Sequence, residues 1–209
     1  MFSFLSPNSR FYQILSRFSD LVILNLLFLL TSLPFFTVGA ANSAMYTLTF
    51  RMLRGKEEPM IKSYFRAFRE SFRQGTALWL LFLVAAVPAA LYFDRFFTAE
   101  GPLHLLFVPF LLVILLSVFC LSFAFPLTSQ FRNSVTGTLR NALLLSLGHL
   151  PRAFVLAVIH LFPAILLLLL PEMFLRVSFL WIALYFSAAA YLSTAVLWKV
   201  FKPFYPEEN

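Results

Sequence analysis

The sequence has little of what a soluble domain relies on. Only 12% of its 209 residues are charged and 61% are hydrophobic, against roughly 25% and 45–50% in an ordinary soluble domain. A soluble protein of this size would have to expose much of that apolar surface to water. We therefore expect the chain to lie in lipid, which excludes secreted disulfide scaffolds and disordered tails.

Residues that carry chemistry are equally scarce. The single cysteine, Cys120, lies in an apolar run, so the sequence supports no disulfide. No cysteine pair, H-E-x-x-H, G-x-S-x-G or glycine-rich phosphate loop occurs, and the three histidines lie far apart in the sequence. We predict no catalytic, cofactor-binding or metal site, and hence a protein that is not an enzyme.

Acidic residues are outnumbered by basic ones. The chain has 16 Lys and Arg against 9 Asp and Glu, a formal net charge of +7. In a membrane protein such an excess marks cytoplasmic loops, so we predict the lipid bilayer as a partner and no nucleic acid. Seven basic residues between Arg51 and Arg73 place that segment in the cytoplasm. The C-terminus, with Lys199 and Lys202, is predicted there too.

The apolar runs predict an all-α, polytopic transmembrane helical bundle forming a single integral membrane domain over 1–209. A membrane helix needs roughly 20 mainly apolar residues, and four stretches meet that requirement: 76–97, 103–125, 154–170 and 174–198. The segments 54–75 and 127–152 are predicted as cytoplasmic connections.

The N-terminal region allows two interpretations, because Pro34 and Gly39 interrupt it. One kinked helix from 21 to 50 gives five membrane helices with the N-terminus outside. A hairpin of helices 11–33 and 39–53 gives six, with the N-terminus in the cytoplasm. We favour six: they place fourteen of the sixteen basic residues inside, against twelve for five helices. The small residues after Gly39 also suit close helix packing. In the hairpin, the Thr37 side chain could cap the second helix.

A basic aromatic pattern precedes the 76–97 run. Within 61–74, three Phe recur at i, i+3 and i+7, and three Arg follow at the same spacing one residue later, which predicts an amphipathic helix. Such a helix can lie in the headgroup layer or contact a partner. The candidate cytoplasmic contact consists of Phe65, Arg66, Phe68, Arg69, Phe72 and Arg73.

Two polar residues fall inside apolar runs. His160 lies near the middle of 154–170, where we expect it to face the bundle and hydrogen-bond a neighbouring helix; passage of protons or solute is the alternative. Asn25 lies in the first run, where an amide usually joins helices, with substrate contact as the alternative. Together with Pro34, Thr37 and Gly39, Asn25 forms a candidate structural or solute-binding break.

The run SDLVILNLLFLLTSLPFFTVGAANSAMYTL, from Ser19 to Leu48, resembles the opening motif of the YesL-like family of bacterial integral membrane proteins. RGKEEPMIKSYFRAFRESFRQG, from Arg54 to Gly75, resembles the second signature of that family. The resemblance implies a plasma-membrane protein of unknown molecular activity with an accessory role in carbohydrate uptake. It suggests permease or sensor-kinase subunits of sugar ABC systems as partners, and carries over no catalytic residue.

Two functions follow as expectations. The first is a non-enzymatic accessory or regulatory component of a carbohydrate ABC uptake system. The alternative is a stand-alone small-solute transporter or channel built around the break at Pro34–Gly39, since unwound backbone can coordinate a solute.

Overall fold

The described part of the chain is all helical. The computed structural model describes residues 10–56, 58–98 and 107–205, with side chains for 14–56, 58–88 and 108–205, and no strand occurs among them. This confirms the predicted fold class. The α-helices are α1 (Arg10–Ser32), α2 (Val38–Leu53), α3 (Met60–Thr98), α4 (Phe107–Gln130), α5 (Val135–Gly148), α6 (Leu150–Leu169), α7 (Pro171–Arg176), α8 (Ser178–Leu180) and α9 (Phe186–Phe201). Short turns of other helix types are η2 (Phe35–Thr37), the π-helical η4 (Trp181–Tyr185) and η5 (Lys202–Phe204).

Five helical stretches are long and apolar enough to cross a membrane. They are Ile14–Ser32, Met60–Pro88, Val108–Gln130, Leu150–Leu169 and Ser178–Phe204. The chain is therefore a polytopic membrane protein. The sixth membrane helix favoured from the sequence, 39–53, is present as α2, but its 16 residues do not qualify as a span by length.

The first two helices form the hairpin rather than the kinked single helix. The Arg17 guanidinium donates a hydrogen bond to the Met52 carbonyl (3.2 Å), so the beginning of α1 lies beside the end of α2. A continuous helix would place those residues at opposite ends. Pro34 is extended (φ −74°, ψ 102°). A proline here ends the helix because it lacks a backbone donor and disfavours the helical conformation of the residue before it.

The short helix α2 occupies the interior of the bundle. It packs against α1, α3, α4 and α9, and ten of its residues are buried. At its start it touches α3 backbone to backbone: a Cβ built on Gly39 would lie 2.1 Å from the Gly75 carbonyl oxygen. Small residues allow this approach, as in other membrane helix pairs.

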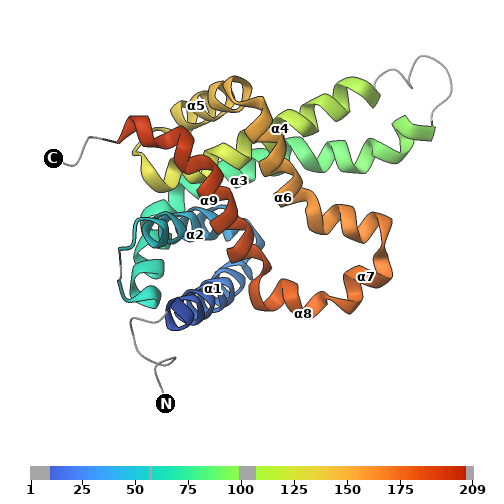
Figure 1. The fold of residues 1–209 in the computed structure, drawn as a ribbon. Coiled ribbons are helices and arrows are strands. Elements are labelled where there is room, and N and C mark those ends of the chain that lie inside the picture. Colours follow the sequence, from blue (N-terminus) through green and yellow to red (C-terminus); the bar gives the residue numbers. More distant parts are fainter. Residues whose placement is uncertain (1–9, 57, 99–106, 206–209) are drawn as a thin grey trace.

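Helix α3 joins two segments that the sequence analysis treated separately. The predicted connection 54–75 and span 76–97 form one helix of 39 residues after a short loop, about 58 Å long at 1.5 Å per residue. Its first half packs on α2 through small or short side chains spaced four apart, whereas its second half projects away together with α4 (Figure 1). The buried residues of that row are Ser63, Ala67, Ser71 and Gly75.

The remaining helices also differ from the expected segments. The predicted connection 127–152 contains α5, whose N-terminus is capped by Ser134 Oγ accepting from the Gly137 amide (3.1 Å). The predicted helix 174–198 is divided into α7, α8, η4 and α9. Figure 1 shows α6, α7 and α8 as an arch that leads back to α9. The first residues of the predicted span 103–125 lie outside the described residues.

Candidate functional site

Asn25 joins α1 to the π-helical turn η4. Its side chain is fully buried, and its amide nitrogen donates to the carbonyls of Trp181 (3.2 Å) and Ile182 (2.7 Å). Its Oδ1 accepts from the Ser187 amide (3.0 Å). A π-turn leaves backbone groups without their α-helical partners, and in lipid each such group is costly. The structure thus gives Asn25 a helix-joining role.

The break at Pro34–Gly39 is closed by its own hydrogen bonds. The Thr37 amide donates to the Pro34 carbonyl (2.8 Å), and the Thr37 hydroxyl donates to the carbonyls of Thr31 (2.5 Å) and Pro34 (2.6 Å). The predicted capping role of the Thr37 side chain is wrong, because its hydroxyl turns back to the end of α1 instead of accepting an amide of α2. The carbonyls of Thr31 and Pro34 are thus bonded within the protein.

His160 lies at the centre of a polar cluster that links four helices. Its Nδ1 lies 3.0 Å from Ser122 Oγ on α4, and its Nε2 lies 3.0 Å from Tyr46 Oη on α2 and 3.5 Å from Ser193 Oγ on α9. Ser122 gives its own proton to the Val118 carbonyl (2.8 Å), so it accepts from Nδ1–H. Nε2 is then the acceptor for the Tyr46 hydroxyl.

A pocket of about 80 Å³ adjoins this cluster. Aromatic and small residues of α1, η4 and α9 form most of its wall, and four side chains with polar atoms, those of Asn42, Tyr46, His160 and Tyr185, line it. Its lining residues are Phe28, Asn42, Met45, Tyr46, His160, Tyr185, Phe186, Ala189 and Ala190. None of them is charged.

The predicted cytoplasmic contact lies on the outer face of α3. Arg66, Arg69 and Arg73 are exposed, and Phe65 and Phe72 are 44% and 37% exposed. Phe68 instead packs partly against the core, stacking on Tyr64. Since the opposite face of α3 is fixed to α2, the arginine side chains project from a firmly held helix.

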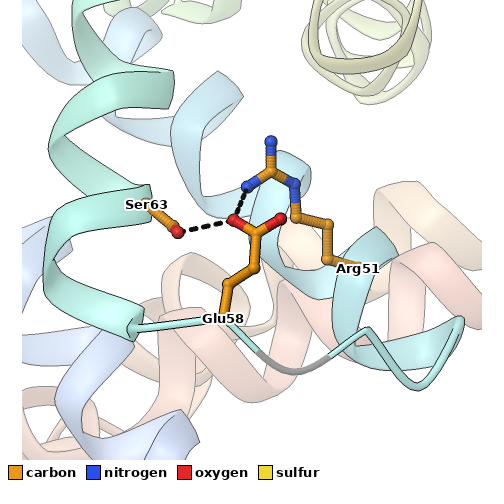
Figure 2. Close-up of polar contacts among 3 residues, drawn as sticks. All are labelled: Arg51, Glu58 and Ser63. Carbon is orange, nitrogen blue, oxygen red and sulfur yellow. Dashed lines mark hydrogen bonds and ion pairs between the residues drawn. The ribbon is translucent and has the colours of Figure 1, made fainter.

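The loop between α2 and α3 is held by one carboxylate. Glu58 accepts from the Arg51 guanidinium (2.6 Å) and from the Ser63 hydroxyl (2.7 Å), as Figure 2 shows. The Ser63 hydrogen bond, followed by the charge of Arg51, lowers the pKa of Glu58. Gly55 has φ +69°, the left-handed conformation that favours glycine after a helix end.

Arg54 joins the same loop to the C-terminal segment. Its guanidinium lies over the rings of Tyr205 (4.3 Å) and Trp198 (5.3 Å) and donates to Gln130 Oε1 (2.6 Å). Tyr205 donates to the same oxygen (2.8 Å). Burial raises the pKa of Tyr205, and Arg54 opposes that rise. The α2–α3 loop, the end of α4 and the C-terminal segment therefore meet at one end of the bundle.

Several of these residues had no role in the sequence analysis. Asn42, Tyr46, Ser122 and Ser193 are isolated in sequence, and only helix packing brings them to His160. Arg54 was counted only as one positive charge. The four-residue spacing of Ser63, Ala67, Ser71 and Gly75 is a readable signal for close packing, but the Phe and Arg pattern on the neighbouring face was interpreted instead.

The comparisons with known proteins agree with the resemblance and add no activity. No curated protein and no solved structure matches the chain. Residues 21–95 match the family described as "Protein of unknown function, DUF624". This region covers the second half of α1, all of α2 and most of α3. The chain thus carries a DUF624 region of unknown function over residues 21–95, with which the YesL-like resemblance is consistent.

Proposed function

We propose that the protein is a non-enzymatic accessory or regulatory component of a carbohydrate ABC uptake system in the bacterial cell membrane. The observation that carries the proposal is the outer face of α3. Arg66, Arg69 and Arg73 are exposed there, while the opposite face of the helix packs on α2. A preorganised face loses little conformational entropy on binding. Carbohydrate uptake itself is taken from the YesL-like resemblance.

The orientation follows from charge and from the contacts at one end of the bundle. Segment 51–73 carries seven basic residues, and an excess of Lys and Arg favours the cytoplasmic side. Arg17, Arg54 and Tyr205 all lie at the end that holds the α2–α3 loop. We therefore assign this end, with both the beginning of α1 and the C-terminal segment, to the cytoplasm.

The partner that suits this face is a permease or sensor-kinase subunit with an acidic cytoplasmic surface. Complementary charge speeds encounter and suppresses wrong partners, and the exposed Phe65 and Phe72 add apolar contact area beside the arginines. Glu70 is exposed on the same side of α3, but the three arginines keep this face net positive, so positively charged partners would be repelled.

The test reverses the charge of this face. A triple substitution of Arg66, Arg69 and Arg73 to Glu should reduce the amount of copurifying permease or kinase at least tenfold and lower sugar uptake in cells. A matched control replaces the exposed Arg132, Arg140 and Lys199 by Glu, which changes net charge equally and should leave copurification intact. Recovery of the wild-type chain always alone, with normal sugar uptake in a deletion strain, would overturn the proposal. A triple variant that changes only the contact of α3 with lipid headgroups, and leaves copurification and sugar uptake unchanged, would overturn it too.

A stand-alone small-solute transporter or channel is the second candidate, and the pocket beside His160 is the observation that favours it. The break at Pro34–Gly39 supports it less, because the carbonyls of Thr31 and Pro34 are already hydrogen-bonded within the protein. Proteoliposomes that contain this chain alone distinguish the two. Accumulation of sugar above the level of empty liposomes would favour transport; its absence, with copurification of a permease, favours the accessory role.

A further inference from the structure

We infer that the pocket beside His160 is a binding site for a small, uncharged polyhydroxy molecule. This goes beyond the proposed accessory role, which depends on the outer face of α3. The pocket is bounded by α1, α2, α6, η4 and α9, so its occupant would contact all the helices that the Asn25 and His160 contacts hold together except α4.

The size of the pocket limits the ligand. Its volume of about 80 Å³ gives room for several water-sized groups, since one water needs only about 10–15 Å³ on the same measure. The pocket is partly open rather than fully enclosed. A molecule of glycerol size, or one end of a larger polyol, fits these limits.

The polar groups on the wall suit a ligand that carries hydroxyl groups. No hydrogen bond joins the Asn42 side-chain amide to another described residue, so it can offer both a donor and an acceptor to the pocket. Tyr46 uses its proton on His160 and its oxygen already bonds the Ser193 hydroxyl, which leaves one lone pair to accept a further hydrogen bond. A hydroxyl group, which donates and accepts, satisfies both residues.

The remaining wall excludes ions and favours C–H surface. No charged side chain lines the pocket among the described residues, and an unpaired ion transferred there would lose its hydration without compensation. The rings of Phe28, Tyr185 and Phe186 form an apolar surface against which the carbon backbone of a polyol can pack. Small ligand sites combine these features, with a mostly apolar wall and a few placed polar groups.

Saturation-transfer NMR on the purified full chain in detergent tests this inference, with glycerol and butan-1-ol as probes of similar size. Glycerol should receive saturation from the protein at least fivefold more strongly than butan-1-ol. Asn42→Leu and Tyr46→Phe should each reduce the glycerol signal threefold to tenfold, the loss expected for one hydrogen bond. Ser117→Ala, on the exposed part of α4, is the control and should leave the signal unchanged.

Two variants keep the outcome interpretable if one of them does not fold. Tyr46→Phe removes one oxygen and retains the buried ring, so it is the milder change. An absent glycerol signal in the wild-type chain, which means that only water enters, would overturn the inference. Equal signals from the two probes, or an unchanged glycerol signal in both pocket variants, would do the same. Charge reversal at Arg66, Arg69 and Arg73 should not alter glycerol binding. The pocket inference and the proposed partner contact can therefore be overturned independently.

Discussion

Helices α2 and α4 show opposite relations between composition and position. α4 is the more apolar of the two, yet its first half exposes Leu111, Leu112 and neighbouring aliphatic side chains. Seven of the 16 residues of α2 are Gly, Ala, Ser or Thr, yet it is the inner helix. Lipid is as apolar as leucine, so burying large aliphatic side chains between helices gains little. Close packing and hydrogen bonds, which small and hydroxyl residues permit, decide which helix lies inside.

The largest expected effect comes from applying one substitution to both helices. Leu48→Ala on α2, where the side chain is 3% exposed, should lower the free energy of unfolding by about 3.5 kcal/mol, because it leaves a cavity. Leu112→Ala on α4, 53% exposed, should change it by less than about 0.5 kcal/mol. Reversible unfolding in mixed micelles measures both. Equal losses of unfolding free energy at the two positions would contradict the assignment of α2 as the inner and α4 as the outer helix.

The contact between α2 and α3 should tolerate no added atom at Gly39. Gly39→Ala brings a methyl group against the Gly75 carbonyl, and we expect a loss of about 3 kcal/mol from forced separation of the helices. Gly148→Ala is the control, since nothing lies within 4 Å of its Cβ position. The same unfolding assay applies. A Gly39→Ala protein as stable as Gly148→Ala would mean that the two backbones do not touch.

Loss of the Asn25 hydrogen bonds should lower the free energy of unfolding slightly less than the Gly39 substitution does. Asn25→Leu keeps the number and branching of the side-chain heavy atoms but leaves two carbonyls and one amide of the η4 region without partners, at a cost of about 2 kcal/mol. Asn141→Leu, at an exposed position on α5, should be nearly neutral. Thermal unfolding monitored by circular dichroism gives both values. A neutral Asn25→Leu variant would show that the π-turn satisfies its backbone groups without α1.

The smallest expected effect is the pH dependence of the α2–α3 loop. The Ser63 hydrogen bond and Arg51 lower the pKa of Glu58 in the folded chain, so the ionised carboxylate stabilises the fold. That contribution is complete above the ordinary pKa of glutamate and is lost as pH falls through the lower folded pKa. Carboxyl NMR titration should show the pKa of Glu58 rising toward its ordinary value in Ser63→Ala. An unchanged pKa in that variant would contradict the contact in Figure 2.

The sequence predicted the fold wherever one local rule dominates. Pro34 ends α1, and the small residues after Gly39 begin a packed helix, so the hairpin could be foreseen. It did not predict that α3 continues through Gly75, because glycine usually weakens a helix and only its contact with Ala40 and Gly39 explains it. The π-turn at Trp181–Tyr185 has no local signal, since its partner Asn25 lies far away in sequence.

The candidate site was predictable only in part, for the same reason. His160 was recognisable as a polar residue within an apolar run. Its partners Tyr46, Ser122 and Ser193 come from three other helices, and their arrangement depends on helix rotation, which hydropathy does not determine. The exposure of Arg66, Arg69 and Arg73 followed the expected amphipathic pattern, whereas Phe68 turned toward the core.

Labelling of the two ends of α2 from opposite sides of the membrane tests the central claim most directly. That claim is our proposal that α2, although its 16 residues make it shorter than the five candidate spans, crosses the bilayer as an inner helix, about 24 Å long at 1.5 Å per residue. In a Cys120→Ser background, Phe36→Cys should react with an impermeant maleimide from outside intact cells, and Lys56→Cys only after the membrane is opened. Protection of position 36, or reaction of both positions from the same side, would contradict the account.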